Sequence, residues 1–139
     1  MEKVEIRWNG NMMLYGKSPS GHDVFMDASE NVGGKDSAAR PMELFAFAIA
    51  GCTAMDVLMI LRKMKLLDKL KDFRVILEYE RKEDYPKIYK WVRVRYLIKG
   101  DIPKENVEKA ASLSQNKYCS ASAMVKSSVE NFTYTVEII

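Results

Sequence analysis

Histidine and cysteine are scarce in this sequence of 139 residues, which contains only His22, Cys52 and Cys119. A zinc site made of cysteine and histidine takes about four such ligands, so three residues spread along the chain exclude one within a single chain. A histidine-dependent catalytic triad would have to use His22, which follows a Ser-Pro-Ser-Gly turn and is expected at the surface. Two cysteines are also too few for the disulfide framework of a small secreted protein.

An excess of one charge is also absent, since 22 Lys and Arg residues face 19 Asp and Glu residues, for a net charge of +3. So small and mixed a charge does not indicate a nucleic-acid partner. The N-terminus alternates polar and apolar residues and lacks the uncharged hydrophobic region of a secretory signal. A cytoplasmic location is therefore expected.

One apolar run, residues 44–61, is long enough to cross a bilayer. It carries Asp56 near its middle, and an aspartate there costs about 2.5 to 3.5 kcal/mol on insertion scales. No second run resembles a membrane span. We therefore interpret this run as a helix buried inside protein, and expect no membrane partner.

The length of the chain and the absence of repeats or linkers predict a single domain covering residues 1–139. Alternation over residues 2–9, an Asn-Gly-Asn turn and the apolar run 12–15 predict a hairpin, and residues 23–26 predict a third short strand. The polar stretch 27–40 is expected to be a loop, and its length suggests a functional role.

A long helix is predicted from Pro41 to about residue 65, since proline suits a first helical turn and Glu43 complements the positive end of the helix dipole. Between Leu44 and Met55 this helix is apolar on every side, which is typical of a helix that is covered all round. A domain of this size has difficulty covering a helix completely. We therefore expect a symmetric homodimer, in which the partner chain supplies the missing cover.

The second half of the chain combines strands and helices. The alternating runs 73–81 and 88–98 predict two long antiparallel strands with one solvent-exposed face. A helix is predicted from residue 102 to 114, a short helix beginning at Cys119, and a strand over 132–139. These elements predict an α+β fold that combines a long, buried helix with antiparallel strands.

The two cysteines have different surroundings in this scheme. Cys119 follows Lys117 and begins a helix, two features that favour a thiolate. Taken singly, each cysteine is also typical of buried packing, and spacing alone does not show that the two meet. At about 100° per residue, the neighbours of Cys52 on its helix face are Phe45, Ala48, Ile49, Met55, Asp56 and Met59.

Two motifs resemble those of the OsmC/Ohr family, which comprises osmotically inducible protein C and the organic hydroperoxide resistance proteins. The segment Pro41–Phe45 (PMELF), followed by Ala50–Cys52 (AGC), is similar to the P-E-[EQ]-L…A-[GA]-C segment that opens the family's central helix. Cys119–Ser122 (CSAS) resembles the family's second-cysteine motif, C-P-x-S. The order of motifs and elements agrees with the family over essentially the whole chain.

This resemblance implies an intertwined, OsmC-like α+β homodimer, in which antiparallel sheets wrap the long central helices from outside. It also implies that the dimer reduces hydroperoxides. It implies that Cys52 is the peroxidatic thiolate, which becomes a sulfenic acid, and that Cys119 resolves the sulfenic acid as a disulfide. A dithiol reductant would restore the thiols by exchange, so this chemistry needs no metal and no organic cofactor. The apolar face around Cys52, which includes Phe45 and Ile49, suits an organic hydroperoxide better than hydrogen peroxide.

Two supporting residues of the family are not matched. Met42 occupies the position of the family's glutamate, and Glu43 lies about 180° from Cys52 around the helix. Glu43 is therefore expected to support the loop, a partner subunit or the first helical turn. The family's arginine has no secure counterpart, and Arg40 and Lys35 are the nearby cations that would support a Cys52 thiolate.

Ser120 replaces the proline of the second motif, and Asp56 opposes a thiolate at Cys52 unless it is paired. The first functional hypothesis is a thiol-dependent hydroperoxide reductase acting through Cys52 and Cys119. The alternative is a non-enzymatic dimer of the same architecture that binds a small apolar ligand beside Cys52. A third, weaker hypothesis makes the basic residues of 62–71 a nucleic-acid patch, although a solvated helix end explains them.

Overall fold

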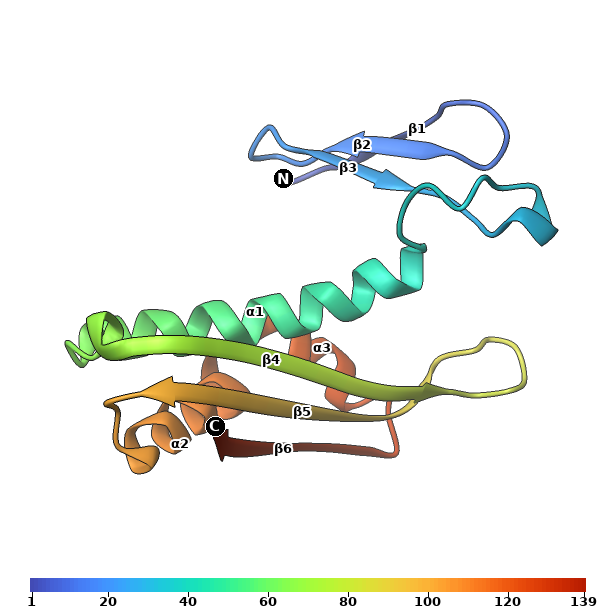
Figure 1. Cartoon of the computed structure of the whole chain (residues 1–139). Helices are drawn as coiled ribbons and strands as arrows, with labels where there is room; N and C mark the ends of the chain where they lie inside the picture. The colour runs from blue at the N-terminus through green and yellow to red at the C-terminus, as the bar shows by residue number, and fades with distance from the viewer. The chain divides into compact units, whose positions relative to one another are not determined.

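A computed structural model describes all residues from 1 to 139, and the chain forms two compact units. The N-terminal unit is Met1–Phe45 and the C-terminal unit is Ala46–Ile139; each is described by itself. Each unit contains a three-stranded sheet, and one long helix, α1, is the longest element of the chain (Figure 1). The predicted α+β fold class is confirmed.

The N-terminal unit is an antiparallel sheet of β1 (Glu5–Trp8), β2 (Leu14–Lys17) and β3 (Asp23–Met26), in that order. Gly10 and Asn11 turn the chain between β1 and β2 with φ values of 88° and 49°. These are left-handed conformations that glycine and asparagine adopt at low cost. The predicted hairpin and the third strand are both present.

The loop after β3 is organised by the buried carboxylate of Asp27. This carboxylate accepts hydrogen bonds from the backbone amides of Ala28, Lys35 and Ser37 and from the Ser37 hydroxyl. The Ser37 hydroxyl is the main reason that the pKa of Asp27 falls to about 2. Gly34 is required because a Cβ there would lie 2.0 Å from the carbonyl oxygen of Ala28. The predicted loop is thus irregular but ordered, with one short 3-10 turn, η1 (Glu30–Val32).

The long helix α1 spans Pro41–Lys63, close to the predicted bounds. By length and composition α1 is apolar enough to cross a membrane, but the fold uses it as a core helix. Its opposite face is open: Phe47, Met55 and Met59 are 68%, 69% and 58% exposed. The C-terminal unit by itself therefore does not cover this helix completely. The buried side chains recur every three or four residues, as expected of one helix face; they are Ala46, Ile49, Thr53, Val57 and Leu61.

The C-terminal sheet has the order β4 (Leu70–Arg81), β5 (Tyr89–Gly100), β6 (Asn131–Ile138). β4 and β5 pair antiparallel as predicted, but β6 pairs parallel to β5. The expectation of antiparallel sheets is therefore wrong for the pair of β5 and β6. Parallel neighbours need a long crossover, and here the chain between β5 and β6 forms α2 (Lys104–Leu113) and α3 (Ser120–Lys126).

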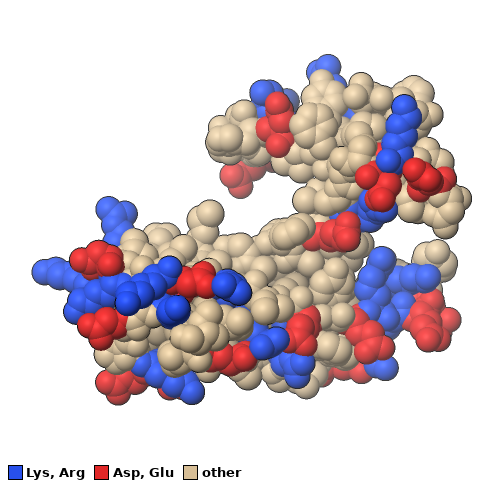
Figure 2. Space-filling view, viewed as in Figure 1, with Lys and Arg blue, Asp and Glu red and all other residues tan.

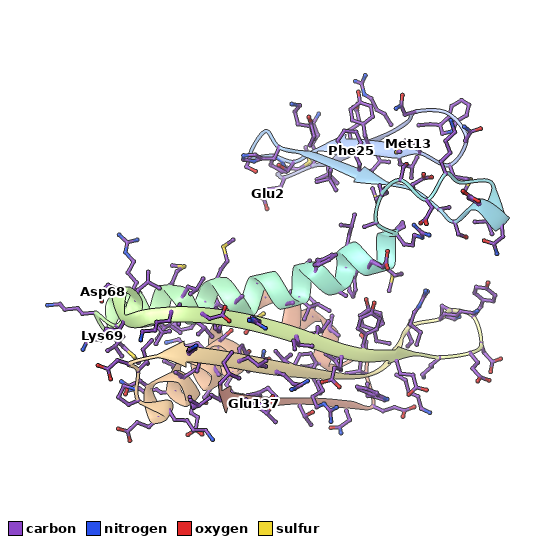
Figure 3. All side chains as sticks on the ribbon, in the orientation of Figure 1. Glu2, Met13, Phe25, Asp68, Lys69 and Glu137 are labelled. Carbon is purple, nitrogen blue, oxygen red and sulfur yellow. The ribbon has the colours of Figure 1, made fainter.

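The two faces of the C-terminal sheet differ in chemistry. On β5, Val92, Val94, Tyr96 and Ile98 are buried, whereas the intervening residues carry charge or remain accessible. The accessible face bears an ion-pair cluster of Glu78, Arg93, Arg95 and Glu137, with Glu137 labelled on β6 in Figure 3. Lys and Arg lie beside Asp and Glu over the visible surface, so no field of one sign dominates that view (Figure 2).

Candidate functional site

The structure brings the two cysteines together. The sulfur atoms of Cys52 and Cys119 and a carboxylate oxygen of Asp56 all lie within 4.8 Å of one another. Both cysteines are free thiols; Cys52 is half-buried and Cys119 is 3% exposed. A disulfide needs a sulfur–sulfur distance of about 2.05 Å, so the two side chains must approach further before they bond.

Cys119 reaches this position because the chain changes helix type there. A π-helix, η3 (Ser114–Tyr118), follows α2 and ends at Cys119, which is the N-cap residue of α3. The backbone N–H of Ser122 donates to the Cys119 sulfur at 3.3 Å. The predicted helix start is thus in place.

The electrostatics of Cys119 differ from the sequence-based expectation. Burial raises the pKa of its thiol, and hydrogen bonding by Ser122 offsets this only in part. Lys117, which was expected to favour the thiolate, has its ammonium 5.1 Å from the centre of the Tyr118 ring. Desolvation penalises the charged form more than the helix start favours it, so Cys119 is held as a thiol.

Asp56 is not isolated, because a chain of hydroxyl groups ends on it. Ser114 Oγ donates to Asp56 Oδ2 at 2.9 Å and lies 2.6 Å from Thr53 Oγ1, which lies 2.5 Å from Tyr96 Oη. At the other end, the amide nitrogen of Gln115 donates to the Tyr96 and Thr53 oxygens. A carboxylate only accepts and an amide N–H only donates, so every hydroxyl in between must donate toward Asp56.

Sequence reasoning missed this hydroxyl chain, although one signal was present. Thr53 is fully buried in an apolar helix, and a buried hydroxyl group needs a partner. Its partners come from β5 and from the π-helix, two elements that are distant in sequence. Thr53, the residue after Cys52, therefore connects α1 by hydrogen bonds to the segment that leads into Cys119.

A small cavity of about 80 Å³ opens beside Asp56. The apolar side chains of Met59 and Ile60, the Tyr118 ring and the Lys63 side chain line the rest of it. Of the other residues expected on this helix face, Ile49 is 1% exposed and packed in the core, and Phe45 is 45% exposed at the end of the N-terminal unit.

The remaining candidates make their contacts inside the N-terminal unit. Arg40 forms an ion pair with Asp36 at 2.6 Å, and its backbone N–H donates to the Glu43 carboxylate at 2.8 Å. Glu43 thus supports the first helical turn, one of the three roles expected for it. Lys35 lines a cavity of about 200 Å³ beside Asp27. His22 is exposed and hydrogen-bonded within its own turn, as expected.

Comparison with known proteins gives consistent results. A family model described as OsmC-like protein matches residues 34–131. Protein YhfA of Escherichia coli strain K12 is 32% identical over 138 residues, which are 99% of this chain and 98% of that protein.

Solved structures extend the similarity to the whole fold. A hypothetical protein from Aquifex aeolicus VF5 is 29% identical with a TM-score of 0.82, over 100% of this chain and 98% of that chain. An organic hydroperoxide resistance protein OsmC from Legionella pneumophila is 18% identical with a TM-score of 0.69, over 99% of this chain and 96% of that chain. The second match shows likeness of fold alone.

Proposed function

The chain belongs to the OsmC-like protein family, and from this premise we propose that it is a thiol-dependent hydroperoxide reductase using Cys52 and Cys119. The observation that carries the proposal is the approach of the two sulfur atoms to within 4.8 Å of one another and of Asp56. The family and a structural neighbour named for organic hydroperoxide resistance support a redox role, whereas the name of Protein YhfA states no activity.

The two sulfurs differ in burial, which supports Cys52 as the attacking thiol and Cys119 as the resolving thiol. Cys52 is half-buried and reachable, whereas Cys119 is buried and its pKa is raised. The Cys52 thiolate attacks the outer oxygen of the hydroperoxide ROOH; an S–O bond forms, the O–O bond breaks, and RO⁻ leaves to become ROH. Cys119 then attacks the Cys52 sulfenic acid, a disulfide forms and water leaves. An external dithiol restores both thiols by exchange.

Asp56 has the position of a proton carrier in this scheme. Its carboxylate lies within 4.8 Å of both sulfurs, and Ser114 holds only one of its two oxygens. Asp56 accepts the proton of the attacking thiol and passes it to the leaving RO⁻, so that charge does not accumulate in the half-buried site. Asp56 thereby replaces the family's glutamate, whose position in this chain is occupied by Met42.

The cavity beside Asp56 supports an organic substrate. Met59, Ile60 and Tyr118 offer apolar surface beside Asp56, whose carboxylate lies within 4.8 Å of both sulfurs. A volume of about 80 Å³ accommodates the first few carbon atoms of a hydroperoxide. Hydrogen peroxide has no group to place there. An organic hydroperoxide is therefore the proposed substrate class.

The open face of α1 supports a homodimer. Phe47, Met55 and Met59 form an apolar surface that the C-terminal unit leaves exposed, and a second copy of α1 offers the same surface in return. We propose that both compact units act as one domain, since the family match at residues 34–131 crosses the boundary between them. A reducing compartment such as the cytoplasm fits a thiol pair that must be re-reduced after each turnover.

A single-turnover experiment tests the function. Reduced protein is mixed with one equivalent of tert-butyl hydroperoxide, without reductant, and analysed by intact-mass spectrometry. Wild type is expected to consume the hydroperoxide and to lose the mass of two hydrogens as the Cys52–Cys119 disulfide forms. Cys119→Ser is expected to stop at a Cys52 sulfenic acid, which a dimedone label reports.

Cys52→Ser decides the proposal. It is expected to consume no hydroperoxide, and an unchanged rate in this variant would show the proposed function to be wrong. A wild-type protein that carries a tightly held apolar molecule and leaves the hydroperoxide intact would instead support the ligand-binding alternative.

A further inference from the structure

The half-buried site contains a set of metal-binding atoms as well as a pair of thiols. Two sulfurs and one carboxylate oxygen, from Cys52, Cys119 and Asp56, lie within 4.8 Å of one another. We propose that the reduced site binds a thiophilic divalent cation, with Zn²⁺ and Cd²⁺ as the preferred ions, and that this metal-bound form cannot react with a hydroperoxide. The scarcity of histidine excludes a Cys/His cluster, but it does not exclude a mixed Cys₂Asp site.

The geometry of the three ligands suits a tetrahedral ion. Zinc binds thiolate sulfur at about 2.3 Å and carboxylate oxygen at about 2.0 to 2.2 Å, which places two thiolates about 3.8 Å apart. Rotations that bring the atoms about 1 Å closer meet this requirement. Cys52 and Asp56 are one turn apart on the same face of α1, the i, i+4 spacing with which helices present two metal ligands. Cys119 completes the set from the start of α3.

The surroundings hold the carboxylate ligand in place. Ser114 Oγ donates to Asp56 Oδ2, and this fixes the carboxylate while its other oxygen remains open to an ion. Such an outer hydrogen bond is the usual support for a metal-binding carboxylate. Ser114 is itself fixed by hydrogen bonds. The Gln115 amide donates to the Tyr96 hydroxyl, which donates to Thr53, and Thr53 donates to Ser114.

A second, independent observation concerns the hydroxyl group of Ser122, beside Cys119. Ser122 is fully buried, and its Oγ has no hydrogen-bond partner. Its backbone N–H donates to the Cys119 sulfur, which places Ser122 beside one of the three ligands. A buried hydroxyl without a partner is costly. A thiolate held by a metal ion, or a water in the fourth position of that ion, would give Ser122 its partner.

Metal binding and disulfide formation exclude each other. An ion needs both sulfurs as thiolates, whereas the disulfide consumes both. The regulatory consequence, that zinc slows hydroperoxide reduction, rests on the proposed function. The binding itself does not rest on it.

Binding is tested with the full-length reduced protein and Cd²⁺ alone, in the absence of oxygen and peroxide. The thiolate-to-cadmium absorption in the ultraviolet is expected to saturate at one ion per chain. Cys52→Ser and Cys119→Ser should each abolish this saturation, and Asp56→Asn should weaken binding at least about tenfold. The matched control is Asp68→Asn, an exposed acid after α1 that is labelled in Figure 3 and should bind as wild type.

A measurement on wild type keeps the test independent of how the variants fold. Cadmium NMR reports the number of sulfur ligands and should give two. No saturable absorption, one sulfur ligand, or unchanged affinity in Asp56→Asn would each overturn the inference. Cadmium binding without hydroperoxide consumption would contradict only the proposed function. Hydroperoxide consumption that stoichiometric Zn²⁺ does not slow would overturn the inference and leave the proposed function standing.

Discussion

The Ser114 hydroxyl donates a 2.9 Å hydrogen bond to Asp56 Oδ2 and so ties the acid of α1 to the π-helix that leads into Cys119. Ser114 also lies 2.6 Å from the Thr53 hydroxyl and is fully buried. One side chain thus joins the two segments that carry the thiols.

Ser114→Ala should destabilise the protein. The substitution removes the acceptor of the buried Thr53 hydroxyl and the donor to the half-buried Asp56 carboxylate, which costs about 1 to 3 kcal/mol of unfolding free energy. Urea unfolding measures this change. Ser112→Ala is the control, because the Ser112 hydroxyl meets only the exposed Asn116 side chain, and a change within about 0.5 kcal/mol is expected. Equal losses in the two variants would contradict the role given to Ser114.

The two cysteines should react at different rates with a thiol-alkylating reagent. Cys119 is 3% exposed and burial raises the pKa of its thiol, so it offers little thiolate, whereas Cys52 is half-buried. Labelling by iodoacetamide at pH 8, followed by peptide mass spectrometry, should modify Cys52 at least about tenfold faster. In urea the two rates should converge; faster labelling of Cys119 in the folded protein would contradict the assignment of Cys52 as the attacking thiol.

Stability in acid should depend on Glu137. Arg95 hydrogen-bonds this carboxylate and lowers its pKa from 4.5 to about 2. A carboxylate with a lowered folded-state pKa stabilises the fold above its unfolded-state pKa, and this contribution is lost as the pH falls through the folded-state value. The unfolding free energy should therefore fall between pH 4.5 and 2, less steeply in Glu137→Gln.

The control for this pH series is Glu83→Gln, since Glu83 is an exposed acid in the turn between β4 and β5. Urea unfolding at several pH values should show that the unfolding free energy of this variant falls with pH as steeply as that of wild type. If the unfolding free energy of Glu137→Gln also falls as steeply with pH as that of wild type, the ion pair with Arg95 does not govern stability in acid.

The oligomeric state should depend on the open face of α1. Met55 is 69% exposed on this face, and an aspartate there would place a charge in the proposed dimer contact. Sedimentation velocity should give a dimer for wild type and a monomer for Met55→Asp. Met124→Asp, at a methionine of α3 that is 78% exposed, should remain dimeric. A monomeric wild type would contradict the homodimer directly.

Much of the fold was predictable from local patterns. Strict alternation identified β4 and β5, and proline followed by an apolar run identified α1 within two residues of its observed end. The Asn-Gly-Asn turn identified the first hairpin. These signals are local because backbone conformation and one-sided burial are properties of a single segment.

The direction of β6 was not predictable in this way. Its alternating sequence is compatible with either direction, and only the crossover through α2 and α3 makes it parallel to β5. The hydroxyl chain from Gln115 to Asp56 was equally hidden, since it joins three elements that are distant in sequence.

By itself, the sequence determined that the reactive equipment of this chain is two thiols and no histidine cluster, because composition limits the chemistry available to any fold. It also determined the elements that carry Cys52 and Cys119. Only the tertiary structure decided that both sulfurs and Asp56 share one site, and that burial opposes the thiolate of Cys119. The reason is physical: distances across the chain and desolvation arise from packing, which no local pattern encodes.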